Sequence, residues 1–467
     1  MTSPLTVVPV APGGWPGIGH ALSMRRDSLA LLSSLPQYGP LVRIQLGPRP
    51  MLVATTPALA RQILVTDARS FHKGSLAGKA RPVMGNGIML SNGDFHLQQR
   101  RQVQPAFHRR RVHAYVDVMS AAAGGLADRL ADGRTVDIRA ELYDAVITIL
   151  GRTLFTTDLG RTAIRQAQTS MPVLQDTAAR RIMSPVQIPL LEKLPTPANR
   201  RFTRAAAQLR GILDQVIAQY QQDGTDRGDL MSMLIAARDT HGQPMPAEQV
   251  ADELITVFAA GMDTSTDTIA WAVRLLGLHP GAAERCQEEV QRVVGARAVT
   301  AEDLPHLTYL HHVVKETLRL HPPANLLMRQ AIAEVNLAGV RLPAGTEVMV
   351  SPLLLHHDPS LFPGPHRFDP DRWNRDETAT LPRGAYIPFG MGARQCVGDT
   401  FAMTEAVVVL ATLLARWRLE PTTGHIIQPV QAVTVSPGRV LITPRAHPLG
   451  SGRSEQRAPR RRGPSHP

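Results

Sequence analysis

Residues 389–398 read FGMGARQCVG, and they combine several features that are unusual together. Three glycines and an arginine surround Cys396, one of only two cysteines among 467 residues. A thiolate is a soft ligand that suits iron or copper, and it is stabilised by backbone N–H groups, positive charge or a metal. Glycines let the backbone turn tightly enough to direct its amides at the sulfur. The stretch therefore predicts a loop that holds an anionic sulfur, with Arg394 and the N-terminus of the following helix adding positive charge.

The second cysteine is predicted to be structural. On a helix, Cys286 shares one face with Ala283, Val290 and Val293, which is typical of a core position. A zinc site is disfavoured because no second Cys or nearby His gives ligand spacing around Cys396. Only Cys396 is therefore expected to carry chemistry.

Composition indicates an ordinary globular protein, with 43% hydrophobic and 19% charged residues. Two cysteines fit a reducing compartment. No apolar run approaches the roughly 20 residues that a membrane-spanning helix needs. The first basic residue is Arg25, so no secretory signal is expected. We expect a cytoplasmic protein without a membrane span.

The net charge of +12 is partly local. Residues 452–467 hold five Arg and one Glu, which gives +4 and leaves +8 for the rest. Pro, Gly, Ser and Arg predict a disordered basic tail over 450–467, either without function or in contact with an acidic partner or membrane surface. No nucleic-acid-binding motif is visible, so no nucleic acid is expected. The remaining charge predicts a basic face for an acidic partner.

Hydrophobic patterning predicts a mainly α protein with small β-sheets. Residues 41–47 and 50–55 are typical of a hairpin that turns at Gly47 and Pro48. Residues 57–320 are mostly helical in pattern, strand signals return over 335–351 and 432–443, and a helix is expected over 400–417. No repeat or interdomain linker is apparent, so we expect a single domain over 1–449 and a monomer.

One predicted helix breaks the rules for a buried helix. It begins near Pro246, ends before Pro280, and has an apolar middle that should cross the core. That middle nevertheless contains Gly261, Asp263 and Thr264, although glycine costs about 1 kcal/mol inside a helix and a buried aspartate needs a partner. Such violations often mark a functional site. The alternative is that hydroxyl groups bond to helix carbonyls and the glycine lets another helix approach.

The cysteine stretch resembles the haem-binding signature of the cytochrome P-450 superfamily. AGMDTS (260–265), KETLRLHPP (315–323) and PDRW (370–373) resemble three further family motifs in the family's order. The resemblance implies the cytochrome P-450 fold, a triangular helical prism with a long central helix and a cysteine loop under the haem. It also implies that Cys396 is the axial thiolate of haem b, which favours O–O cleavage of dioxygen.

The same resemblance implies roles for residues outside the cysteine loop. Ala260 and Gly261 would leave room for dioxygen, Thr264 would hydrogen-bond it, and Asp263 would relay protons. A second Glu-x-x-R match, at 289–292, lacks the family context. The residues implied to brace the haem loop are Glu316, Arg319 and Arg372. The family often has Glu and Phe where Asp371 and Trp373 stand.

The resemblance further implies cofactor and substrate contacts. The residues expected at the haem and its propionates are His96, Arg100, Arg329, Phe389, Arg394 and Cys396. His96 stands where the family usually has Trp, and a surface histidine is the alternative. The residues expected to line an apolar pocket are Met84, Ile88, Met89, Val257, Phe258, Ala260, Gly261, Leu326, Leu327 and Val433. Such a pocket favours a small lipophilic substrate.

No flavin or iron–sulfur domain is attached, so electrons are expected from NAD(P)H through a ferredoxin and its reductase. APGGWPGIGHAL (11–22) and LPTPANRRF (194–202) resemble actinobacterial sesquiterpene oxidases. This implies stepwise oxidation of a methyl group of pentalenene to alcohol and aldehyde, in antibiotic biosynthesis. Macrolide, fatty-acid or other terpene hydroxylation stays open, as do a haem-thiolate peroxygenase and a non-catalytic haem sensor.

Overall fold

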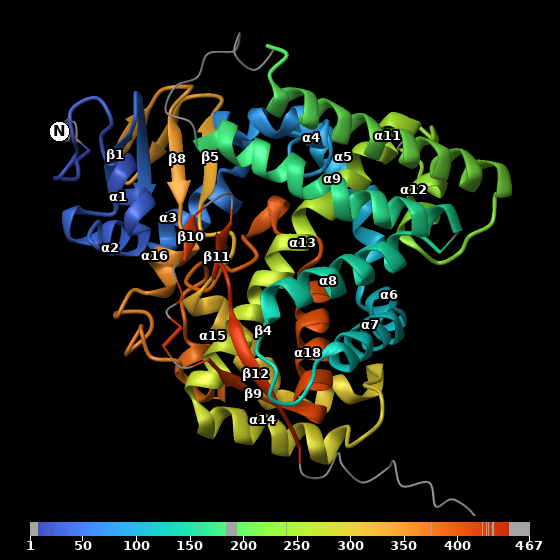
Figure 1. Ribbon diagram of the computed structural model, residues 1–467. Coiled ribbons are helices and arrows are strands. Elements are labelled where there is room, and N and C mark those ends of the chain that lie inside the picture. Colours follow the sequence, from blue (N-terminus) through green and yellow to red (C-terminus); the bar gives the residue numbers. More distant parts are fainter. Residues whose placement is uncertain are drawn as a thin grey trace, which may run out of the picture.

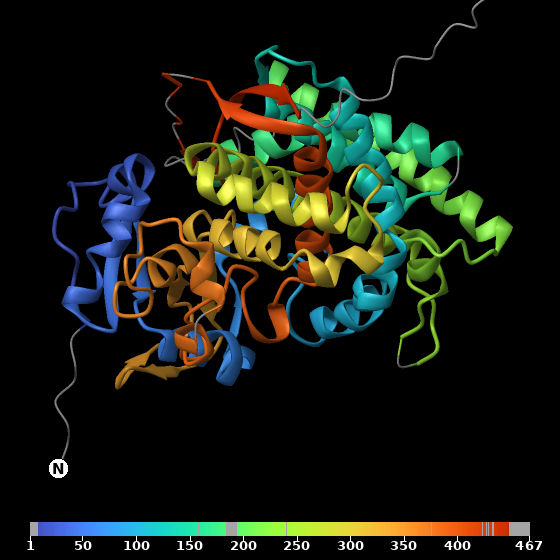
Figure 2. The same cartoon turned by 90° about the horizontal axis from the view of Figure 1, so that it is seen from below.

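The computed structural model describes residues 8–447 apart from 157, 184–193, 240, 375, 423, 426, 428, 432 and 433. A β-rich region lies beside a larger helical part, as both views show (Figures 1 and 2). The helices are α1 (Ala21–Arg26), α2 (Ser28–Ser33), α3 (Pro57–Arg61), α4 (Arg81–Met84), α5 (Gly93–Val103), α6 (Arg109–Ala114), α7 (Val116–Arg129), α8 (Ile138–Leu154), α9 (Asp158–Met183), α11 (Pro197–Asp223), α12 (Leu230–Ala236), α13 (Ala247–Leu278), α14 (Pro280–Val293), α15 (Thr308–Leu320), α16 (Pro352–His356), α17 (Asp376–Ala379) and α18 (Asp399–Arg416).

The main sheet has the strand order β1-β2-β8-β5-β3. Its strands are β1 (Leu41–Leu46), β2 (Arg49–Ala54), β3 (Phe71–Lys73), β5 (Leu327–Ala331) and β8 (Glu347–Val350). The β2–β8 pair is parallel and the other pairs are antiparallel. Because β3 pairs with β5, Lys73 lies opposite Arg329. The sheet thus places two cations side by side from segments about 250 residues apart in the chain.

Three short sheets complete the β structure. β9 (Trp417–Pro421) and β4 (Val136–Asp137) flank β12 (Leu441–Ala446), while β6 (Val335–Leu337) pairs with β7 (Val340–Leu342). β10 (Val430–Gln431) pairs with β11 (Val435–Ser436). One apolar core lies among the helices and a second lies around the main sheet. The cysteine loop connects the two parts, since it follows the β-rich region and leads directly into α18.

The long helix α13 is the centre of the helical part (Figure 1). It spans 32 residues, about 48 Å, and contacts α8, α11, α15 and α18. Gly261 lies against α8, because an added Cβ would approach the Leu150 methyl groups to 3.0 Å. The expected helix is confirmed, with Pro246 as its N-cap rather than its first residue.

Most sequence-based expectations about the fold are confirmed. The hairpin forms with Gly47 at a φ of 61°, the helix after the cysteine begins at Asp399, and Cys286 is fully buried. Four strands differ from the expectations. β3 and β4 interrupt the stretch expected to be mostly helical, β5 precedes the expected strands because Arg329 and Gln330 break the alternation, and β9 begins at Trp417, where a helix is expected to end. The tail over 450–467 lies outside the described residues.

Glu405 gives α18 a buried acid whose titration should be measurable. Its side chain is inaccessible, and neither carboxyl oxygen has a hydrogen-bond partner among the described residues. Burial raises the pKa of Glu405 to about 8, and the Ser265 hydroxyl on α13 opposes this shift without completing a hydrogen bond. The acid is therefore predominantly neutral in the folded protein at pH 7.

Replacing Glu405 should change how stability depends on pH. The folded protein retains this proton from pH 4.5 to about pH 8, whereas the unfolded chain loses it near pH 4.5. Stability therefore falls as pH rises through this window, by up to about 5 kcal/mol from this group. Glu405→Gln should remove that part of the decline in urea unfolding at pH 5 and pH 8. Identical pH dependence in the two proteins would contradict the assignment.

Candidate functional site

The cysteine loop is a tight turn packed against the β-rich region. Gly390 and Gly392 adopt φ values of 70° and 72°, which favour glycine. A Cβ at Gly392 would collide with the carbonyl oxygen of Leu64. The Cys396 N–H donates to the Phe389 carbonyl at 2.9 Å, which closes the loop. The residues of the loop are thus fixed by backbone contacts rather than by side-chain packing.

The sulfur of Cys396 borders free space on one side and protein on the others. Desolvation raises the pKa of Cys396 to about 11, and the Gly398 amide and Arg100 oppose this only in part. Arg394, expected to add charge at the sulfur, instead donates to the Ser91 carbonyl at 3.0 Å and to Asn92 at 2.8 Å. Among the described residues, only the Gly398 amide and Arg100 counteract the desolvation of this sulfur.

A group of three cations lies beside this loop, with Arg329 buried and Lys73 and Arg394 half-buried. Arg329 is 6% exposed and donates to the carbonyl of its neighbour Met328 at 2.8 Å, and Arg394 has a buried Nη1 without a partner among the described residues. Burial lowers the pKa of each guanidinium to about 10, and repulsion by Arg394 adds to the effect on Arg329. Lys73 belongs to the same group, because burial and then both arginines lower its pKa to about 7.

Clustered cations with no acidic partner in the described part of the chain indicate a site for an anionic ligand. Isolated buried charges are costly, so the group is stable only if carboxylates or phosphates compensate it. A haem with two propionates fits this donor set, and Cys396 lies beside it. Lys73 has no distinguishing pattern in the sequence, because only strand pairing brings it next to Arg329.

His96 is 4% exposed, so the alternative of a surface histidine is wrong. Its ring nitrogens lie 3.0 Å from the Ile88 carbonyl and 3.2 Å from the Ala393 carbonyl. Burial and Arg394 lower the pKa of His96 to about 4, so the ring is neutral and donates to one carbonyl at a time. Arg100 donates to the Gln395 carbonyl. Both side chains therefore join α5 to the cysteine loop.

The middle of α13 carries an acid and an alcohol in consecutive positions. The Thr264 hydroxyl donates to the Ala260 carbonyl at 2.7 Å. Burial raises the pKa of Asp263, while Arg139 of α8 lies 3.8 Å away and opposes the shift. Arg139 pairs more closely with Asp267, at 2.7 Å. Asp263 is thus held loosely, by an arginine that is bound mainly to another acid.

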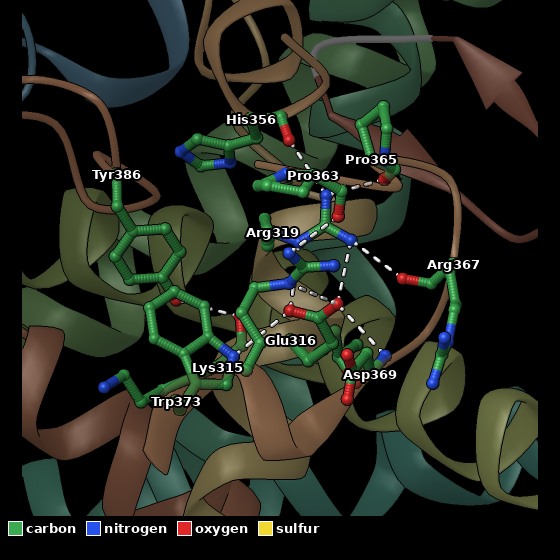
Figure 3. Close-up of polar contacts among 12 residues, drawn as sticks. Lys315, Glu316, Arg319, His356, Pro363, Pro365, Arg367, Asp369, Trp373 and Tyr386 are labelled. Carbon is green, nitrogen blue, oxygen red and sulfur yellow. Dashed lines mark hydrogen bonds and ion pairs between the residues drawn. The ribbon is translucent and has the colours of Figure 1, made fainter. Parts of the chain in front are cut away.

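Glu316 is the centre of a buried polar network (Figure 3). Arg319 donates to both carboxyl oxygens of Glu316, at 2.8 and 2.9 Å, and neither side chain is exposed. Arg372 lies 3.4 Å from one oxygen, the Asp369 amide donates to that oxygen at 3.2 Å, and the Trp373 indole donates to the other at 3.1 Å. The expected triad is brought together, and Trp373 adds a donor that phenylalanine lacks.

This network reaches the cysteine loop through its neighbours (Figure 3). Arg319 donates to the His356 carbonyl at 2.9 Å, and the His356 ring accepts from the Ile387 amide at 2.9 Å. Tyr386 donates to the Lys315 carbonyl at 2.9 Å. The chain just before Phe389 is therefore fixed to α15 from two sides. The sequence did not single out His356 or Tyr386.

The expected pocket residues are only partly brought together. Met84 and Ile88 are both 8% exposed and lie against α13, and Thr256 approaches the Met84 carbonyl at 3.5 Å. Phe258 instead stacks on Phe155, with ring centroids 6.0 Å apart. Val257 borders a cavity of about 10 Å³, too small for more than one water. The remaining expected residues are half-buried, as Met89, Ala260, Gly261, Leu326 and Leu327, or outside the described residues, as Val433.

A wider cleft lies on the other side of the cysteine loop. It has a volume of about 620 Å³ and is bordered by Phe389, Asp399 and Thr404 from the loop and α18. Arg109 and His113 of α6 lie at its edge. The cleft thus lies between α6, the cysteine loop and the start of α18.

Comparison with known proteins identifies the family. The model of the Cytochrome P-450 family matches residues 9–444. The chain belongs to the cytochrome P-450 family. It is a haem-thiolate monooxygenase by that membership, with dioxygen as co-substrate. Three helical motifs and the cysteine loop described above are therefore in their expected family context.

Several relatives are similar over nearly the whole chain. Cyclooctatin synthase of Streptomyces melanosporofaciens is 41% identical, over 93% of this chain and 95% of that protein. Cyclooctat-9-en-7-ol 5-monooxygenase of the same organism is 40% identical, over 89% and 90%. Pentalenene oxygenase of Streptomyces avermitilis is 37% identical, over 92% and 95%. In the described part of the chain, none of the helices has the length and apolarity to span a membrane.

Removing the carboxylate of Glu316 should destabilise the protein far more than removing one of its hydrogen-bond donors. Glu316→Ala leaves the guanidinium of Arg319 buried without a counter-charge, which costs about 3–5 kcal/mol. Trp373→Phe removes one neutral donor and should cost about 1 kcal/mol. We expect little haem in Glu316→Ala and near-normal haem in Trp373→Phe, measured by absorbance and urea unfolding. Equal stability of the two variants would contradict the central place of Glu316.

Proposed function

We propose that this protein is a P-450 monooxygenase that oxidises a C–H bond of a small terpenoid, with Cys396 as the ligand of the haem iron. The observation that supports the proposal is the set of three cations beside the cysteine loop, one buried and two half-buried, for which the described residues provide no acidic partner. When bound, the haem supplies the activation of dioxygen. Lys73, Arg329 and Arg394 compensate its propionates, and His96 and Arg100 fix the cysteine loop.

The acid and alcohol of α13 are proposed to handle protons at the oxygen side of the site. The Thr264 hydroxyl donates to its own helix at Ala260, so it must rotate to donate to a ligand. Asp263 has a raised pKa, which makes it a better proton donor near neutral pH. Its contact with Arg139 is long, at 3.8 Å, so the carboxyl group is free to turn toward Thr264. This pair argues against peroxide as the natural oxidant.

The terpenoid class is supported by relatives and by the character of the site. The names of two relatives specify an alkene, pentalenene, and an unsaturated alcohol, cyclooctat-9-en-7-ol. The side chains expected to face the substrate are apolar, which favours a lipophilic molecule without charge. Pentalenene is one candidate, with stepwise oxidation of a methyl group as its reaction, and cyclooctat-9-en-7-ol is the second.

The first test is an optical titration of the purified ferric protein with both compounds. We expect a saturable blue shift of the Soret band at micromolar concentration for at least one of them. Cys396→Ala should lose the carbon monoxide spectrum that is typical of thiolate ligation. Flat titrations with an intact spectrum would refute the terpenoid proposal and leave macrolides and fatty acids to be tried. An unchanged carbon monoxide spectrum would refute Cys396 as the ligand.

The electron donor is proposed to be an acidic ferredoxin that docks at the cleft beside the cysteine loop. Arg109 and Arg110 of α6 are exposed at this face, and Arg101 and His108 are exposed nearby. Clustered exposed cations accelerate association with an acidic partner, and salt screens the effect. The route from NAD(P)H through a reductase to the ferredoxin is part of the same proposal.

Charge reversal at this face should weaken reduction by ferredoxin. Arg109→Glu with Arg110→Glu should lower the rate of reduction at low salt by at least tenfold and reduce its salt dependence, measured by stopped-flow absorbance. The matched control is Arg200→Glu with Arg201→Glu, two exposed arginines of α11. An equal loss in both double variants, or no salt dependence in the unmodified protein, would refute the docking face.

A further inference from the structure

Residues 84–88 are bound to α13 through four side chains of that helix. Asp252 accepts from the Asn86 amide at 2.7 Å, and Glu253 accepts from the Ile88 amide at 2.9 Å. Thr256 donates to the Met84 carbonyl, with a longer separation of 3.5 Å. Gln249 donates to the Asn86 carbonyl at 3.3 Å, so an amide side chain also holds this segment. We call Asp252, Glu253 and Thr256 the clamp residues.

The segment has the glycines that such an approach requires. Gly85 has a φ of 56°, and a Cβ there would collide with the Asp252 carboxylate. A Cβ at Gly87 would collide with the Thr256 hydroxyl. The backbone is therefore closer to α13 than any residue with a side chain would allow. The close approach of this segment to α13 therefore requires glycine at both positions.

The clamp acids have few other partners, so the segment determines whether they are satisfied. Glu253 is fully buried and also accepts from Gln249 at 2.8 Å, while no cation contacts it among the described residues. Asp252 is 5% exposed, and its second oxygen pairs with Arg210 of α11 at 2.6 Å. A buried carboxylate that loses an amide donor is costly. The segment is therefore held in one position relative to both α13 and α11.

Ile88 is fixed at both of its backbone groups. Glu253 binds its amide, and His96 contacts its carbonyl while also contacting Ala393 in the cysteine loop. The Ile88 amide is thus bound to α13, and its carbonyl lies at one nitrogen of the His96 ring, whose other nitrogen lies at the Ala393 carbonyl. Met84, at the other end of the segment, is tied to α13 in the same way.

We propose that the clamp residues are positioning residues that set how far Met84 and Ile88 extend over the haem site, and so determine which ligands and substrate positions the site accepts. This inference rests on the proposed function, in which both side chains line the pocket. A loosened clamp would let the segment move outward and widen the site. Bulky ligands would then bind relatively better, and oxidation would occur at more than one position of the substrate.

Two variants of Glu253 separate this role from a loss of packing. Glu253→Ala removes the acceptor of the Ile88 amide, whereas Glu253→Gln retains an acceptor oxygen at the same place. The control is Glu289→Ala on α14. Glu289 is also a buried acid that accepts two amides, those of Tyr309 and Leu310 at 2.8 and 2.9 Å, but it lies away from the haem site.

The first readout is amide hydrogen exchange of residues 86 and 88 in the haem-loaded protein. The second is the ratio of affinities for imidazole and 1-phenylimidazole, which bind haem iron and are followed by the Soret band. Glu253→Ala should exchange at least tenfold faster at these amides and change the affinity ratio at least tenfold in favour of the bulky ligand. Glu253→Gln should resemble the unmodified protein in both readouts. Glu289→Ala should be less stable with both readouts unchanged.

The outcomes separate the clamp from the proposed function. An unchanged affinity ratio in Glu253→Ala, or an equal change in Glu289→Ala, would overturn the clamp. Neither readout needs the natural substrate, so a failure of the terpenoid titrations would leave the result of this test intact. If pentalenene is oxidised, Glu253→Ala should also give additional regioisomers, and a single unchanged product would overturn the proposed role in specificity.

Discussion

The ion pair between Glu316 and Arg319 is the contact on which the haem side of the molecule depends. Two opposite charges are removed completely from water, which is stable only when further hydrogen bonds satisfy both groups. Those bonds come from the segment that precedes the cysteine loop. The carboxylate accepts from Asp369 and Trp373, and the guanidinium donates to carbonyls at His356, Pro365 and Arg367. The irregular segment that precedes the cysteine loop is thereby held by hydrogen bonds to one buried ion pair.

The cations on the other side of the loop follow the opposite principle. Glu316 and Arg319 form an ion pair within the protein. Lys73, Arg329 and Arg394 instead repel one another, which contributes to the lowered pKa values of Lys73 and Arg329. The proposed haem propionates would compensate this repulsion. The Glu316 network thus fixes the segment before the cysteine loop, and the cations are proposed to bind the cofactor.

The sequence predicted those features that reside in local pattern. The cysteine loop, the hairpin and the long helix each have a distinctive spacing of Gly, Pro or apolar residues, and all three form where expected. The roles expected of Cys396, Asp263 and Thr264 remain predictions. Lys73, His356 and Trp373 could not be found in this way, because their partners are distant in the chain and are defined by strand pairing or by the path of a loop. The Arg394 side chain is expected to add charge at the sulfur, but it donates instead to Asn92, which is distant in the chain.

The polar residues of α13 suggest why this helix tolerates acids in the core. At about 100° per residue, Asp252, Thr256, Asp263 and Asp267 fall within about 60° of one another on the helix surface. They form one polar stripe along an otherwise apolar helix. The first two bind the segment 84–88, and the last two share Arg139. One end of this stripe therefore binds the segment 84–88, and the other end carries Asp263. Both ends of the stripe lie on one helix. The segment that we propose to line the pocket and the acid that we propose to handle protons therefore share a single structural element.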